Sequence, residues 1–182
     1  MAFTPDQWRV CKHSVASFVF QLVVYTAAYC LPLPTPVLPT VFDRLIFTLR
    51  WLTLDVFTLF MIIIVVANTR FSTSQINPLS KKDIQYVEIH SRCLQNTLEQ
   101  LTIGAFGKLA LCTFLGNEGM RYVPVMTFLF VLGRITFWIG YLNQPIKRAF
   151  GFATNTGVNL VIYVSLAYHL VVYGPMYGLA SW

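Results

Sequence analysis

The chain alternates between long apolar runs and shorter polar segments. Five of the runs approach or exceed the length needed to cross a hydrocarbon core, which takes about 20 residues of helix. They cover residues 14–33, 45–67, 98–115, 122–142 and 152–173. The first run is too long for the apolar part of a cleavable signal peptide. The pattern therefore predicts an all-α integral membrane protein, multi-pass and in contact with membrane lipid, with five spans.

The connections between the runs are of two kinds. After the first run, residues 31–39 contain four prolines, which stop the helix and predict a stiff extended connector. The longest polar segment, residues 68–95, contains Asn77-Pro78 and charges of both signs, and is predicted to be the main loop outside the membrane. Its second half, from Lys81 onward, also suits a helix that extends the third run outward.

Lysine and arginine are distributed unevenly between the two sides that five spans would define. Eight lie on the side of the N-terminus and three on the other side. Because cytoplasmic loops carry the excess of basic residues, we expect a cytosolic N-terminus and a lumenal C-terminus.

Composition supports a membrane location and excludes some functions. Only 11% of the residues are charged, whereas a soluble domain has about 25%. The net charge of +6 is scattered between apolar runs and forms no patch, which argues against nucleic-acid binding. The four cysteines lack the spacing of a metal site, and we expect neither a metal nor a disulfide framework.

Polar residues recur at helical spacing where the bilayer should exclude them. Arg92, Asn96 and Glu99 lie four and three residues apart at the start of the third run. Arg134, Tyr141 and Arg148 recur at intervals of seven through the fourth run and the loop after it, which brings them to one stripe if the helix is continuous. Because ionisable groups are costly in a membrane unless they face a polar interior or a ligand, these residues are functional candidates.

The residue types in these stripes favour a particular ligand chemistry. Guanidinium groups grip carboxylates with paired hydrogen bonds, and Glu99 would pair with an ammonium group. Glutathione carries both groups, and an arginine beside its sulfur would favour the thiolate, because a nearby cation lowers the pKa of a thiol. The alternatives are structural: an ion pair between Arg92 and Glu99 on the helix surface, and an Arg134 that is neutralised by Asp55 or Glu99.

Two motifs in this order resemble a known family. The pattern Arg92-x3-Asn96-x2-Glu99 before an apolar span, and the later stretch 134–149, are similar to the MAPEG proteins (membrane-associated proteins in eicosanoid and glutathione metabolism). The resemblance implies a four-helix protomer over residues 41–182, preceded by an extra helix and connector over residues 1–40. It also implies a homotrimer that binds glutathione between subunits and has glutathione transferase or peroxidase activity toward lipophilic electrophiles.

The resemblance also assigns roles to residues. The expected glutathione contacts are Arg70, Arg92, Asn96, Glu99, Arg134 and Tyr141. Arg148 matches the arginine that activates the thiol in catalytic members.

Two departures from the family pattern suggest an alternative function. Phe137 stands where several members carry a tyrosine or histidine near the sulfur, and the helix over residues 14–33 is additional. Five spans, with the segments 44–50 and 87–92, resemble the mattrin branch of the family, which is linked to endomembranes (endoplasmic reticulum, Golgi or lysosome). The alternative is therefore a non-enzymatic scaffold with membrane-protein partners, which regulates endomembrane trafficking or receptor stability.

Overall fold

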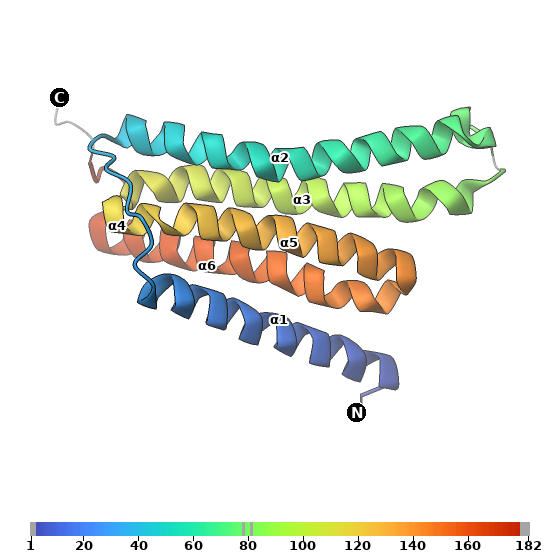
Figure 1. Cartoon of the computed structure of the whole chain (residues 1–182), viewed down its shortest axis with the longest axis horizontal. Helices are drawn as coiled ribbons and strands as arrows, with labels where there is room; N and C mark the ends of the chain where they lie inside the picture. Colours follow the sequence, from blue (N-terminus) through green and yellow to red (C-terminus); the bar gives the residue numbers. More distant parts are fainter. Residues whose placement is uncertain (1–2, 78, 81, 179–182) are drawn as a thin grey trace.

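Five long helices make up most of the part of the chain that the structure describes. The structure is a computed structural model, and it describes residues 3–77, 79–80 and 82–178. The long helices are α1 (Pro5–Cys30), α2 (Val41–Phe71), α3 (Ile84–Phe114), α5 (Tyr122–Asn143) and α6 (Ala149–Tyr173) (Figure 1). The short elements are η1 (Ser74–Ile76), α4 (Asn117–Met120) and η2 (Pro145–Arg148). The prediction of an all-α fold is confirmed.

Each predicted apolar run lies within or largely overlaps one long helix. The largest difference concerns α3, which begins at Ile84 and so extends the third run far outward. The segment after Lys81 is therefore helical and extends the third run outward, as the sequence analysis allowed. Two of the long helices start at capping boxes: Thr4 forms one with Gln7 before α1, and Thr40 forms one with Asp43 before α2.

Four helical segments within the described residues are long and apolar enough to cross a membrane. They are Pro5–Cys30, Val41–Phe71, Asn117–Asn143 and Pro145–Tyr173. Although α3 is as long as α2, with 31 residues each, its polar residues keep it outside this group. Several of them, including Thr97 and Lys108, are buried in the bundle and so do not face lipid. Because several of its helices are apolar enough to cross a membrane, the chain is an integral multi-pass membrane protein. α3 runs beside α2 in the bundle (Figure 1).

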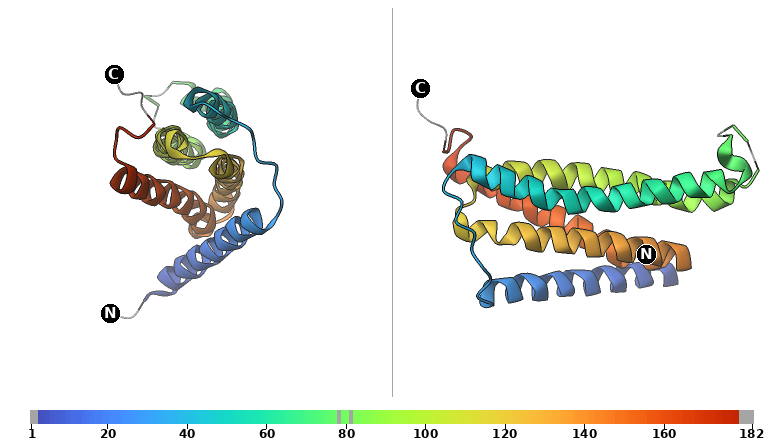
Figure 2. Two further views of the ribbon diagram at one scale, coloured as in Figure 1. Left: turned by 90° about the vertical axis from the view of Figure 1, so that its left-hand side faces the viewer. Right: turned by 45° about the horizontal axis from the view of Figure 1, so that its top comes forward.

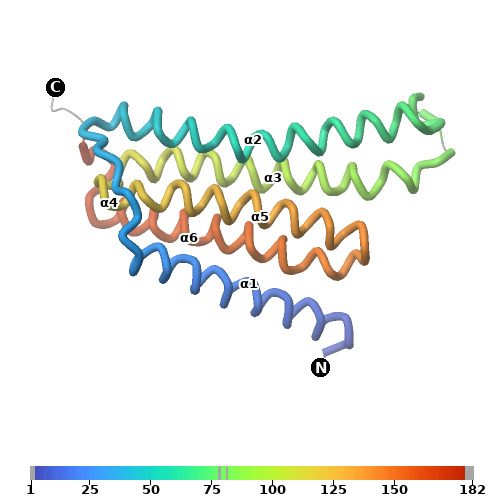
Figure 3. Tube along the Cα trace, viewed as in Figure 1, coloured from blue at the N-terminus to red at the C-terminus, as the bar shows by residue number. Residues whose placement is uncertain are grey.

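The helices are arranged as two hairpins with α1 on the outside. α2 and α3 form one antiparallel pair, and α5 and α6 form the other (Figures 1 and 3). α1 packs mainly on α6, and the extended connector leads from its end across the bundle to α2 (Figure 2). The connector and α4 lie at one end of the bundle, and η2, in the turn between α5 and α6, lies at the other end (Figure 1).

Glycines allow α5 and α6 to approach closely near η2. A Cβ at Gly151 would lie 2.2 Å from the backbone nitrogen of Phe137, and one at Gly140 would lie 2.6 Å from the Lys147 carbonyl oxygen. On the other side of α6, the side chains of Asn159 and Ile162 fill the space at Gly104 and Gly107 of α3. Small residues at helix interfaces permit this kind of packing in membranes.

Polar contacts fix α1 on α6. The hydroxyls of Ser17 and Thr154 lie 2.8 Å apart, and both residues are buried. The Gln21 amide donates to the Ser17 hydroxyl at 3.2 Å and lies against Gly157, where a Cβ would come within 2.5 Å of it. Lipid tails are as apolar as leucine side chains, so apolar surface gives no preference for one docking site over another. Interhelical hydrogen bonds and small residues therefore determine where a helix packs.

A buried ion pair crosses the centre of the bundle. Lys108 Nζ of α3 lies 2.5 Å from the Asp55 carboxylate of α2, and both side chains are almost fully buried. The ammonium group also donates to the Thr127 hydroxyl of α5 at 3.2 Å and lies over the Phe130 ring. Lys108 therefore has a structural partner on each of two neighbouring helices.

Candidate functional site

Arg134 forms the buried side of the candidate site. Its Nη1 donates to the Asn96 side-chain oxygen of α3 at 2.9 Å. With the Asn155 amide of α6 oriented so that its oxygen faces the guanidinium, that oxygen accepts from Nε at 2.5 Å and Nη2 at 2.8 Å. Arg134 Cζ also lies 4.8 Å from the centroid of the Phe137 ring. Arg134 thus ties α3, α5 and α6 together, and its partners are amides, not Asp55 or Glu99 as the structural alternative held.

Arg148 lies on the turn between α5 and α6. α5 ends at Asn143, Gln144 is extended, and η2 begins at Pro145, because a residue before proline is disfavoured in a helix. The seven-residue stripe is therefore not one continuous helix. The turn nevertheless folds back on Gly140 and places Arg148 Cζ 4.6 Å from the centroid of the Tyr141 ring. Arg148 is exposed and directly precedes α6, so its charge adds to the positive end of that helix.

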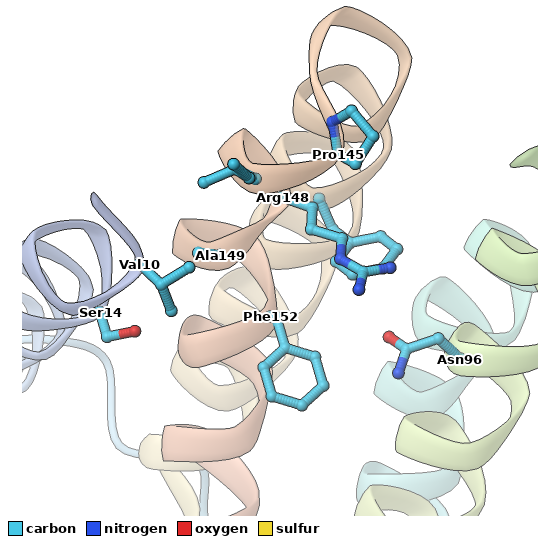
Figure 4. Close-up of a pocket in the computed structure, with 9 residues that line it drawn as sticks. Val10, Ser14, Asn96, Pro145, Arg148, Ala149 and Phe152 are labelled. Carbon is cyan, nitrogen blue, oxygen red and sulfur yellow. The ribbon is translucent and has the colours of Figure 1, made fainter. Parts of the chain in front are cut away.

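A cavity of about 370 Å³ opens beside Arg148. Arg148 and Asn96 point toward one another, and the Phe152 ring lies beside them (Figure 4). Its lining residues come from four parts of the chain: Val10, Ser14, Asn96, Phe137, Pro145, Ile146, Arg148, Ala149 and Phe152. Salt bridges in the described residues leave Arg148 without a carboxylate partner. The cavity thus combines an unpaired cation with a polar amide and apolar walls.

Arg92 lies close to Tyr141 but outside this cavity. Its guanidinium forms an ion pair with Glu88 at 2.7 Å, one turn earlier on α3. The pKa of Arg92 is raised, first by the hydrogen bond to Glu88 and further by the Tyr141 hydroxyl. The predicted alternative of an ion pair between Arg92 and Glu99 is therefore wrong, because Glu88 is the partner. Tyr141 is buried and lies under the Arg148 guanidinium.

Glu99 is an exposed carboxylate at membrane depth. It accepts a hydrogen bond from Gln95 at 2.8 Å but has no cation within ion-pair distance among the described residues. α2 and α3 run antiparallel, and Lys108 of α3 contacts Asp55 of α2. Glu99 therefore lies level with the apolar second half of α2. Arg92 is about 10 Å further out, and Arg70 is exposed in the last turn of α2.

The sequence analysis missed several residues that shape the site. Asn155 is fully buried in an apolar run, so the rule that singled out Arg134 should also have singled out this amide. Val10 and Ser14 line the cavity from α1, which is far away from the other lining residues in the sequence. Only the folded structure brings that helix to the site.

The fold and this cavity define a polytopic, all-helical membrane protein with a basic site at one end of the bundle. Comparison with known proteins supports a narrower assignment. The model of the MAPEG family matches residues 48–168, which is more than half of the chain. The chain belongs to the MAPEG family, and the matched region contains every residue predicted for the site.

Two curated relatives share one name. Transmembrane protein 79 of Mus musculus is 26% identical over 172 residues, which cover 92% of this chain and 44% of the relative. Transmembrane protein 79 of Bos taurus is 27% identical over 143 residues, which cover 79% of this chain and 36% of the relative. The chain thus spans less than half the length of these relatives. Mattrin is another name for transmembrane protein 79, so the predicted resemblance to the mattrin branch is confirmed. No solved structure matches significantly.

Proposed function

We propose that this protein binds glutathione at the cavity beside Arg148 and lowers the pKa of its thiol. The observation that carries the proposal is the exposed Arg148 guanidinium, which has no carboxylate partner among the described residues and faces Asn96 across the cavity. Arg148 and the start of α6 would stabilise a thiolate, and Asn96 offers an amide to the peptide groups of the ligand. Arg134 would act behind Asn96 as a positioning residue.

The proposed reaction is transfer of glutathione to a lipophilic electrophile. The thiol gives up its proton to solvent, and the thiolate forms a carbon–sulfur bond with an electrophilic carbon dissolved in the bilayer. A proton from solvent or departure of a leaving group completes the step. The protein supplies position and positive charge, and the ligand supplies the nucleophile.

The exposed Glu99 supports a site that is completed by a second subunit. A carboxylate that faces lipid at this depth is costly, whereas one that pairs with an ammonium group or a neighbouring chain is not. We propose a homotrimer in which Glu99 and Arg92 of one subunit face the Arg148 cavity of the next. In this arrangement Arg70, at the end of α2, lies near the rim of the site.

Glutathione should stabilise the purified protein against thermal unfolding. At a hundredfold excess over the Kd the gain is about 2.7 kcal/mol, because only the folded state binds. Arg92→Ala should remove most of this gain and leave the fold intact, since its exposed ion pair with Glu88 contributes little to stability. Arg50→Ala, which removes an exposed arginine from α2, is the matched control and should keep the full gain.

Absence of any shift in the wild-type protein at millimolar glutathione would contradict the proposal. The mass of the particle in mild detergent tests the subunit arrangement separately. A monomer that binds glutathione with full affinity would rule out a site between subunits and leave the binding itself supported.

Bound glutathione should titrate at a lower pH than free glutathione, as measured by thiolate absorbance in the ultraviolet. Arg148→Ala should restore the higher pKa, and each unit of pKa corresponds to about 1.4 kcal/mol. Phe137→Tyr should lower the pKa further, because it adds a hydroxyl to the wall of the cavity. Identical titration of bound and free glutathione would show that Arg148 does not activate the thiol.

A further inference from the structure

A second cavity, of about 640 Å³, lies at the other end of the bundle. Its walls come from the end of α1, the connector, α2 and the start of α5. The lining residues are Val24, Leu33, Pro34, Thr35, Pro36, Phe47, Trp51, Arg121, Pro124, Val125 and Phe128. Nearly all of them are apolar. Phe128 is exposed on α5, in a segment apolar enough to cross a membrane, so the cavity opens sideways toward lipid.

Arg121 is the one charged residue in this wall. Its Nε is buried and has no hydrogen-bond partner. Its other contacts are weak: Nη2 lies 3.4 Å from the Tyr122 hydroxyl, and Cζ lies 5.2 Å from the centroid of that ring. The salt bridges of the described residues do not include Arg121. A buried donor on a cation is costly when it is unpaired, so this guanidinium has the capacity for an anionic partner.

The connector suits the wall of an apolar cavity. Pro34 and Pro36 have no backbone N–H, so they place few unpaired donors against lipid. The backbone of Leu38, further along, donates to the Asn117 side chain at 3.0 Å. This contact ties the connector to α4, four residues before Arg121. The extended connector therefore forms a wall with a fixed position beside the cation.

We propose that this cavity binds a single-chain amphiphile with an anionic headgroup. The acyl chain lies among the apolar residues and leaves toward lipid past Phe128, and the headgroup pairs with Arg121. A volume of this size is within the range of about 300–1,000 Å³ that ligand sites occupy. The headgroup is a carboxylate, as in a fatty acid, or a phosphate, as in a lysophospholipid. Guanidinium groups recognise both by paired hydrogen bonds.

Trp51 provides a direct readout, because bromine atoms quench tryptophan fluorescence on contact. The probes are a fatty acid, a lysophosphatidate and a neutral monoacylglycerol, each brominated at mid-chain and added to the whole chain in maltoside micelles. The difference between the wild-type protein and Trp51→Phe isolates the signal of Trp51. We expect both anionic probes, or one of them, to quench Trp51 at far lower concentration than the neutral probe. Which of the two binds more tightly identifies the headgroup.

Arg121→Gln should weaken binding of the anionic probe about tenfold or more, the effect of losing one charged hydrogen-bonding partner. It should leave the neutral probe unchanged. Arg50→Gln, an exposed arginine on α2, is the control and should change neither. Arg121→Lys keeps the charge and should retain binding, which covers the case in which Arg121→Gln does not fold.

Val125→Phe fills the cavity without removing a charge, and it should weaken quenching by every probe. The proposal is overturned if the neutral probe quenches Trp51 as well as the anionic probes do. It is also overturned if neither Arg121→Gln nor Val125→Phe changes the quenching. Both results would mean that ordinary lipid or detergent occupies the cavity. Because this site is separate from the Arg148 cavity, loss of glutathione binding does not affect the outcome.

Discussion

Replacement of Lys108 by methionine should destabilise the protein by about 3–5 kcal/mol, because it leaves the Asp55 carboxylate buried without a counter-charge. The second carboxylate oxygen of Asp55 already has no partner in the structure, so the site has no spare donor to replace the ammonium group. The loss should appear as a large fall in the thermal unfolding midpoint in detergent or lipid nanodiscs.

The double variant Lys108→Met with Asp55→Asn is the test of this cause. It removes both charges and should recover most of the lost stability, because an apolar or neutral pair often replaces a buried ion pair at little cost. If the double variant is as unstable as the single one, the loss comes from the packing of Lys108 on Phe130 and not from the isolated charge.

Gly151→Ala should also destabilise the protein, although it adds a single methyl group. Its Cβ would lie 2.2 Å from the Phe137 nitrogen and 2.4 Å from the Gly133 carbonyl oxygen, and neither backbone atom can move aside. Overpacking costs about 1–3 kcal/mol, and the start of α6 must shift away from α5. Because Arg148 directly precedes α6, the shift should also abolish the lowered pKa of bound glutathione.

Gly116→Ala is the matched control for this variant. A Cβ at Gly116 meets no atom within 4 Å, and its φ of −78° is accessible to alanine. We expect its stability to stay within about 0.5 kcal/mol of the wild type, and the titration of bound glutathione to be unchanged. Equal effects of the two glycine variants would contradict the close packing of α5 on α6.

Much of the fold could be predicted because membranes constrain sequences strongly. The five apolar runs located the long helices, since a helix in lipid must satisfy its backbone internally. Pro145 located the turn after α5, because proline removes a donor and restricts the residue before it. The two polar motifs also indicated the MAPEG family, which the family comparison confirms.

The partners of the polar residues could not be predicted in the same way. The helical stripe suggested Glu99 for Arg92, but Glu99 is seven residues away, whereas Glu88 lies four residues before Arg92 and so has the spacing of an ion pair along a helix. Arg134 of α5 forms hydrogen bonds with the amides of Asn96 on α3 and Asn155 on α6. These three residues are neighbours only because the three helices pack together. Glutathione binding, the trimer, the orientation and the organelle stay predictions, because they depend on contacts of this chain with other molecules.

The docking of α1 has a consequence for both cavities. Val10 and Ser14 line the first cavity, and Val24 of the same helix lines the second, about 15 Å further along. Between them, Ser17 and Gln21 hold α1 in one register on α6. A ligand that displaced α1 along its axis at one end would have to break these hydrogen bonds and reshape the other cavity. α1 is thus a wall that the two cavities share, and any coupling that a displacement of α1 produced between them would be equal in both directions by thermodynamic linkage.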